Sequence, residues 1–236
     1  NKYFPRNPLW ALREAVCLAP DVVQVFDLPL EEKDSEDVIV QKLTVNRDIV
    51  VQYDKWMKQH KLRSKDTMKN GLPRFSAFSL LGVAHGDYPG AYAEEAEFMA
   101  KYCEVVGVPV GGLTLKRQYK YIGKVLKAVL DVVSGRVIQL MGFGLSSVEK
   151  LTEIVKTAMQ YDDATLWLES STVVRNSAHG HKVLTLNPKT GKITYKAVAA
   201  IKDWKKSFKG KDIFEYNNKV LLGILNELQA SLPTTR

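Results

Sequence analysis

Five apolar runs of the chain each end in residues that could contribute to a ligand site. In order, the runs end at Asp27, at His85–Gly86–Asp87, at Gly111–Gly112, at Met141–Gly142–Phe143–Gly144 and at Glu169. If the runs are successive parallel strands, their carboxyl ends gather carboxylates, an imidazole and glycine turns around one pocket. The glycines would let a flat ligand, or its phosphate, approach the backbone closely.

Several of these residues also have a plainer interpretation. Asp27 precedes Leu–Pro, as turn-forming residues often do, and His85 on its own could be a hydrogen-bonded core histidine. Glycine ends many strands. Glu169 differs, because it follows a largely apolar TLWL segment, and we expect it to be buried with a buried partner.

Strand-like and helix-like segments alternate along the chain and must position these residues. The runs DVVQVFDLP, FSAFSLLGVAHGD, VVGVPVGGL, RVIQLMGFG and TLWLESS predict strands. Between them, helical periodicity covers about 45–61, 88–106, 119–133 and 146–160. This alternation predicts an α/β fold with a parallel sheet and crossover helices.

The rest of the chain predicts a hairpin and a closing helix. The segment LTLNPKTGKITYK should turn at Asn187 to Gly191, a basic insertion covers about 187–212, and the closing helix runs from about 216 to 232. We find no repeat or linker, so residues 1–236 are predicted to form a single domain.

Composition narrows the class of protein. The formal charge of +8 and the pI near 9.3 favour a polyanionic partner, although solvated lysine faces produce the same totals. The sequence has no apolar run of 18 or more residues, as a membrane span needs, and no apolar segment after its basic start, as a secretory signal needs. We therefore expect a cytoplasmic protein without a membrane span. Cys17 and Cys103 lack zinc-ligand spacing and are predicted to be buried thiols.

Several segments resemble the tRNA-guanine transglycosylase superfamily, the queuine and archaeosine tRNA-ribosyltransferases. VPVGGL, IQLMGFG and TLWLESSTVVRNSAHGH are similar, in order and spacing, to its a-i-G-G-L, y-L-M-G-v-G and D-L-F-D-C-V-x-P-T-R-N-A-R-N-G-H. When Glu169 is aligned with the nucleophilic aspartate of that family, the family's R-N and G-H align without a gap with Arg175, Asn176, Gly180 and His181. VVQVFDLP, LLGVAHGDYPGAYAEEA and YNNKVLLGILNELQASL extend the resemblance over about residues 15–232.

The resemblance implies a TIM (β/α)8 barrel of the transglycosylase type. It also implies exchange of guanine in nucleic acid for a 7-deazaguanine co-substrate, through a covalent carboxylate–ribose intermediate. Glu169 would be the nucleophile, and Asp27 would bind the Watson–Crick edge of the base. His85 would occupy the position of the glutamine that binds the base in the family. The remaining base-binding residues would be Gly86, Gly111, Gly112, Leu113, Met141 and Gly142.

The chain departs from the family pattern in ways that bear on its chemistry. Glu169 replaces an aspartate, and its extra methylene moves the carboxylate by about 1 Å, a misplacement that can cost about 100-fold in rate. The zinc cysteines are replaced by KAVAAIKDWKKSFKGKDIF and the zinc histidine by Tyr216, so no metal or cofactor is expected.

The family's D-S-G-G-F segment, with its second catalytic carboxylate, and the preceding strands have no counterpart. We therefore expect a barrel that is incomplete at its N-terminus and lacks the zinc-binding subdomain. Either the given chain is partial, or a second chain, such as the other subunit of a homodimer, completes the site.

Loss of the zinc module favours the DNA-acting branch of bacteria and phages over a tRNA enzyme. A basic stretch with Trp204 and Phe208 between its lysines could follow a phosphate backbone, although a solvated lysine face with core aromatics is an equal interpretation. The predicted nucleic-acid-binding residues are Arg175, His181, Lys182, Lys202, Lys205, Lys206, Lys209 and Lys211.

Three functional hypotheses remain open on the sequence. The first is a pentosyltransferase that exchanges guanine. The second is a catalytically silent nucleic-acid-binding subunit of the same fold, which the glutamate and the missing segment favour. The third is an unrelated TIM-barrel enzyme on a small phosphorylated substrate, which requires the GG and GFG turns to hold phosphate.

Overall fold

The protein has a mixed α/β fold built on a five-stranded parallel sheet. The computed structural model describes residues 8–10, 12, 15, 18, 20–60, 62, 78–110, 121–133, 135–142, 148–169, 182–187, 189–197 and 210–231. The strands are β1 (Val22–Gln24), β2 (Ser79–Val83), β3 (Val105–Pro109), β4 (Val137–Met141) and β5 (Thr165–Leu168). They lie in the order β1-β2-β3-β4-β5, and each neighbouring pair is parallel. The prediction of a parallel α/β sheet is confirmed.

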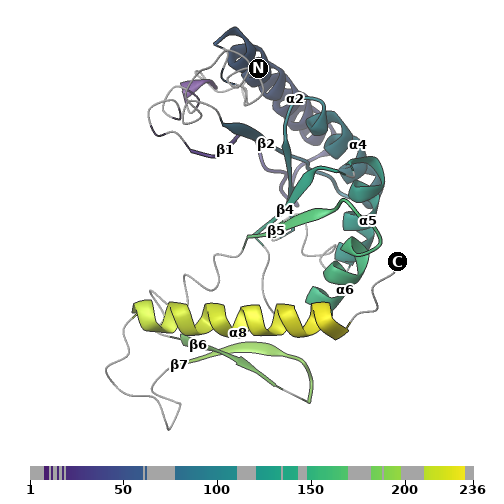
Figure 1. The fold of residues 1–236 in the computed structure, drawn as a ribbon. Helices are drawn as coiled ribbons and strands as arrows, with labels where there is room; N and C mark the ends of the chain where they lie inside the picture. Colours follow the sequence, from purple (N-terminus) through teal and green to yellow (C-terminus); the bar gives the residue numbers. More distant parts are fainter. Residues whose placement is uncertain are drawn as a thin grey trace.

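The crossover helices cover one face of this sheet. They are α2 (Glu36–Gln59), α4 (Pro89–Ala100), α5 (Ile122–Val133) and α6 (Val148–Ala158), and Figure 1 shows them side by side on the outer side of the curved sheet. Strands that follow one another in chain order with crossovers of one hand place every helix on the same side. A doubly wound sheet would instead reverse its strand order and carry helices on both faces. The described strands do not close into a barrel.

Alternation along the strands divides the side chains between an outer and an inner face. The outer side chains pack under the helices and are fully buried, as at Leu80, Val106, Val108, Ile138 and Leu140. The predicted helical stripes supply the other half of this core, with Val45, Ile49 and Tyr53 from α2 and Tyr92, Ala96 and Met99 from α4. Cys103 is buried beside them, as predicted.

The inner face carries a smaller apolar cluster. Leu81, Val83 and Val105 form it, with Val22, Val137 and Met141 packed at its margin. Gly107 lies among them, and a Cβ at this position would come within 2.7 Å of the Met141 sulfur and 2.9 Å of Leu81 Cδ2. The missing side chain therefore leaves the space that the Met141 thioether fills.

A hairpin and a long helix follow the sheet. β6 (Lys182–Leu186) and β7 (Ile193–Ala197) are antiparallel, and the chain turns between Asn187 and Gly191 as predicted. Figure 1 shows α8 (Gly210–Ser231) lying across this hairpin. The fully buried Asn217 of α8 accepts a hydrogen bond from the Leu184 amide at 2.7 Å and donates one to the Lys182 carbonyl at 3.1 Å. This amide ties the helix to the hairpin.

Two helices begin earlier than the periodicity predicted. α2 starts at Glu36 rather than near residue 45, because its first turns carry acidic residues that suit the positive end of the helix dipole but lie outside the apolar stripe. α8 starts at Gly210 rather than near 216, so the predicted basic insertion at 187–212 includes β7 and the first turn of α8. No helix in the described part of the chain is long and apolar enough to cross a membrane.

Candidate functional site

Asp27 lies just beyond the carboxyl end of β1 and is held by one side chain from β1 and one from the loop that follows β2. Gln24 Nε2 donates to its Oδ1 at 3.0 Å, and His85 Nε2 lies 2.7 Å from its Oδ2. An ionised carboxylate can only accept, so with Asp27 ionised this contact requires the His85 tautomer that has its proton on Nε2. The His85 side chain is 5% exposed and that of Asp27 is 18% exposed. The structure thus brings together two of the predicted site residues, but in a largely buried pair.

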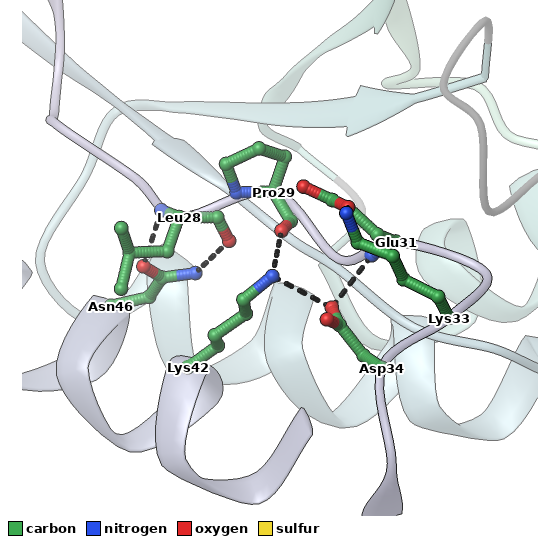
Figure 2. Close-up of polar contacts among 7 residues, drawn as sticks. All are labelled: Leu28, Pro29, Glu31, Lys33, Asp34, Lys42 and Asn46. Atoms are coloured by element: carbon green, nitrogen blue, oxygen red, sulfur yellow. Dashed lines mark hydrogen bonds and ion pairs between the residues drawn. The ribbon is translucent and has the colours of Figure 1, made fainter. Parts of the chain in front are cut away.

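The residue after Asp27 is fixed to helix α2 by one buried amide. The Leu28 amide donates to Asn46 Oδ1 at 2.7 Å, and Asn46 Nδ2 donates to the Leu28 carbonyl at 3.1 Å (Figure 2). Asn46 is 1% exposed, so both of its bonds are shielded from water. This pair of bonds fixes the backbone immediately beside the Asp27 carboxylate.

A buried ion pair fixes the next part of the same loop. Lys42 Nζ donates to Asp34 Oδ2 at 2.7 Å and to the Pro29 carbonyl at 2.9 Å, and the Glu31 amide donates to Asp34 Oδ2 at 2.7 Å (Figure 2). Burial acts to raise the pKa of Asp34, but Lys42 and the Glu31 amide outweigh it and lower the pKa below its ordinary value. The loop that carries Asp27 is therefore pre-organised by charge and hydrogen bonding.

A second carboxyl group is buried in the helix that follows His85 along the chain. Glu95 on α4 is 2% exposed, and Arg47 Nη2 on α2 lies 2.5 Å from its Oε1. Burial raises the pKa of Glu95, and the charges of Arg47 and His85 oppose part of that rise. Sequence reasoning missed this residue, although it shares the helical face of Tyr92 and Met99 and could have been found there.

Gly86 has a packing role in the structure. A Cβ at this position would come within 2.7 Å of the Tyr92 amide nitrogen and 3.1 Å of the Ala91 carbonyl carbon. Since these are backbone atoms of the first turn of α4, they cannot move aside as a flexible side chain could. Glycine is therefore required where β2 meets α4, and contact of Gly86 with a base stays a prediction.

Glu169 follows β5 directly and projects from the inner face of the sheet. Its amide donates to the Leu140 carbonyl at 3.0 Å, so the strand pairing continues to this residue. Gln139 Nε2 on β4 donates to Glu169 Oε2 at 2.9 Å. Glu169 is exposed, and the prediction of a buried carboxylate is wrong. β5 is an edge strand of the described sheet, so only its outward residues, Leu166 and Leu168, meet the core.

Trp167 and Gln139 are neighbours of Glu169 that sequence reasoning missed. Trp167 is directly opposite Gln139 in the β4–β5 register, and its side chain is 42% exposed. Residues 165, 167 and 169 share one face because successive side chains on a strand point to opposite sides. That period of two in TLWLE is the signal that could have placed Trp167 beside Glu169.

Met141 and Gly142 end the neighbouring strand. Met141 is partly buried, and its side chain rests over Gly107 on the inner face. Gly142 is exposed with φ +64°, a left-handed conformation that glycine adopts at little cost. The two residues mark the rim of the sheet between β3 and Glu169, and their contact with a base stays a prediction.

The register places the two carboxylates at the same end of the sheet. Val83, Gly107, Gln139 and Trp167 are aligned across four strands, and His85 and Glu169 each lie two residues further along their chains. Asp27 and Glu169 are therefore both at the carboxyl ends, as predicted, but they follow the strands at opposite edges of the sheet. Their convergence around one pocket stays a prediction.

Several predicted site residues lie outside the described residues. These are Gly111, Gly112, Leu113, Arg175, His181, Lys202, Lys205, Lys206 and Lys209. Lys182 is exposed on β6, and Lys211 falls within α8. Among the residues that the structure describes, no three His, Cys, Asp or Glu side chains gather as ligands of a metal would. Tyr216, which the resemblance aligns with a zinc histidine, is 39% exposed on α8.

A cavity of about 400 Å³ lies behind β5, away from the predicted site. It is lined by Leu166 and Leu168 of β5, Leu225 of α8, and Ile154, Val155, Ala158 and Met159 of α6 and its end, with Tyr161 and Ala164 beside them. Tyr161 alone supplies a polar side-chain atom to this lining, and that hydroxyl contacts Asp131 and Lys127. The cavity therefore offers apolar space without acid–base or nucleophilic groups.

The sequence matches no protein-family model, and no curated protein is similar enough to count as a relative. Conclusions about its activity therefore rest on the residues and their geometry.

Proposed function

We propose that this chain exchanges guanine in nucleic acid for a 7-deazaguanine, acting on DNA in preference to tRNA, with Glu169 as the nucleophile. The five parallel strands would be part of a transglycosylase-type (β/α)8 barrel. Sequential strand order, with the described crossover helices α2, α4, α5 and α6 on one face, supports this proposal, because a barrel of that kind is wound in the same way. The site would then open at the carboxyl ends of the strands, where Asp27 and Glu169 lie.

The observation that carries the proposal is the placement of Glu169. Its carboxylate is exposed on the inner face, directly after the fifth strand, with Oε2 held by Gln139. Among the described residues, no hydrogen bond engages Oε1. A carboxylate with one oxygen fixed and the other open is suited to attack an anomeric carbon or to stabilise the positive charge that develops there.

The reaction would proceed in two displacements. An oxygen of Glu169 attacks C1′ of the target nucleotide, and the bond from C1′ to N9 breaks with its electron pair leaving on guanine, which takes up a proton. N9 of the incoming 7-deazaguanine then attacks C1′, loses its proton, and releases the Glu169 carboxylate from the ester bond. Asp27, with a fixed backbone and a carboxylate oriented by Gln24 and His85, would accept hydrogen bonds from the edge of the base.

Gln139 would compensate for the greater length of the glutamate. By register, Glu169 lies opposite Met141, but its carboxylate contacts Gln139, two residues earlier on β4. The Glu169 side chain therefore bends back along the inner face, toward the amino ends of the strands. An aspartate, one methylene shorter, would reach less far along the same diagonal. Gln139 is therefore a positioning residue, and it gives the glutamate a defined carboxylate position.

The proposal is tested by incorporation of labelled guanine into single-stranded DNA, with tRNA in parallel. We expect exchange with the wild-type chain, none with Glu169→Gln, and retained exchange with Glu169→Asp. Glu97→Gln is the matched control, because Glu97 is an exposed glutamate on the outer helix α4 that pairs with Lys101. Absence of exchange with both polymers, or undiminished exchange in Glu169→Gln, would overturn the proposal.

A nucleic-acid-binding subunit without catalysis is the second candidate function. It is favoured by the pairing of both Asp27 oxygens, with Gln24 and with His85, which reduces the capacity of Asp27 to bind a base. This function predicts binding of the polymer without exchange, and with unchanged affinity in Glu169→Gln. The same set of variants therefore separates the two candidates.

A further inference from the structure

Glu169, Gln139 and Trp167 form a compact group on the inner face of β4 and β5. Gln139 donates to Glu169 at 2.9 Å, and Trp167 is the register partner of Gln139 on the next strand. The group combines a carboxylate, a primary amide and an indole that is 42% exposed. We name these residues the β4–β5 triad.

We propose that the β4–β5 triad is a subsite for the pentose of the target nucleotide. This inference rests on the proposed function, since it assigns the sugar whose C1′ would react with Glu169. The indole would pack against the apolar face of the sugar ring. The Gln139 amide would donate to the ring oxygen or a hydroxyl oxygen, and the Glu169 carboxylate would accept from a sugar hydroxyl. A site of this kind joins one apolar surface to a few placed polar groups.

The depth of each residue supports the sugar over the base as the bound group. Trp167 lies two residues before Glu169 on the same face of β5, and Gln139 is opposite Trp167 on β4. Both are therefore closer than Glu169 to the amino ends of the strands. The Glu169 carboxylate itself bends back to Gln139, so a sugar whose C1′ meets it can lie against Gln139 and Trp167. The base would extend across the sheet toward Met141 and Asp27, at the ends of β4 and β1.

The amide of Gln139 keeps hydrogen-bonding capacity for such a ligand. One N–H is used by Glu169, and a primary amide has a second N–H and a carbonyl oxygen. Val83 and Gly107, which precede Gln139 in the same aligned row, offer no polar side chain. Among the described residues of this row, polar groups for recognition are therefore supplied by Gln139 and by the indole N–H of Trp167.

Saturation-transfer NMR on the full chain tests the subsite with three probes. These are 2′-deoxyguanosine monophosphate, the methyl glycoside of 2-deoxyribose, and 9-methylguanine, which carries the base alone. We expect the sugar protons of the first two probes to receive strong saturation. We also expect Trp167→Leu to weaken binding of both about five- to tenfold, because aromatic packing beyond buried area has that worth.

Two further variants test whether binding depends on the aromatic ring of Trp167 and on the amide of Gln139. Trp167→Phe should retain most of the affinity, since it keeps a flat ring, and Gln139→Leu should weaken sugar binding about three- to tenfold. Trp10→Leu is the matched control, because Trp10 is 58% exposed and lies outside the sheet. Thermal unfolding of each variant checks that its fold is intact.

The outcomes separate the subsite from the proposed function. Saturation confined to base protons, or sugar binding that is unchanged in Trp167→Leu, would overturn the subsite even if guanine exchange occurs. Trp167-dependent saturation of the sugar protons supports the subsite even if no exchange is observed, because binding of these probes needs no turnover.

Discussion

The two carboxyl-end clusters of the sheet differ in how they are held. The cluster after β1 is enclosed, because Asp27 pairs with a buried His85 and its loop is fixed to α2 through Asn46 and Lys42. The cluster after β5 is open, with an exposed Glu169 that contacts one amide from the next strand. A rigid group suits recognition of a base, and an accessible carboxylate suits attack on a carbon atom.

The enclosed side should show the largest effects on stability. Asp34→Asn removes one charge of the buried pair with Lys42, and we expect a loss of about 3 kcal/mol in the free energy of unfolding near pH 7. Urea denaturation measures this loss. Glu32→Gln, an exposed position in the same loop, should stay within about 0.5 kcal/mol of wild type.

The pH dependence of that loss follows from the lowered pKa of Asp34. The ionised form is favoured in the folded protein, so its contribution is complete above the ordinary aspartate pKa of 3.8 and is lost as pH falls below it. The difference between wild type and Asp34→Asn should therefore shrink in acid. A difference that stays constant from neutral pH to about pH 2 would contradict the assigned ion pair.

Asn46→Leu should have the next largest effect. It leaves the Leu28 amide and carbonyl without their partners, and unsatisfied buried groups of this kind cost about 2 kcal/mol in the free energy of unfolding. Thr44→Val, on the exposed side of α2, is the control and should change little. If both variants unfold at the same urea concentration, the loop is not fixed in the way that Figure 2 shows.

The open side should show small effects on stability and larger effects on rate. Gln139→Leu should leave the free energy of unfolding within about 0.5 kcal/mol of wild type, since the contact is exposed. It should lower the rate of guanine exchange about tenfold, because the carboxylate loses its fixed position. If Gln139 acts through Glu169, the substitution should have no further effect in a Glu169→Asp background. Equal losses in both backgrounds would contradict the positioning role.

Much of the fold could be predicted because local patterns determine it. Each apolar run became a strand, and the stripe of Val45, Ile49 and Tyr53 identified α2. The start of α2 was missed because its first turn carries Glu36 and Asp37, outside the apolar stripe, and because Lys42 ties the helix to Asp34 of the preceding loop. Loop ion pairs of this kind leave little trace in a hydrophobic pattern.

The site was harder to predict because its contacts join distant parts of the chain. Asp27 and His85 are separated by 58 positions, and their hydrogen bond depends on the pairing of β1 with β2. The exposure of Glu169 depends on the place of β5 at the edge of the described sheet, which sequence does not reveal. Gln139 and Trp167 became visible only once the register of β4 and β5 was known.

The most direct test of the account is the mass of a trapped complex. The full chain is incubated with a guanosine-containing single-stranded oligonucleotide, without the incoming base, and the product is digested for peptide mapping. We predict a covalent species with the mass of the protein plus the oligonucleotide less guanine, and its attachment at Glu169. The absence of any such species, or an adduct mapped to another residue, would contradict the assignment of Glu169 as the nucleophile.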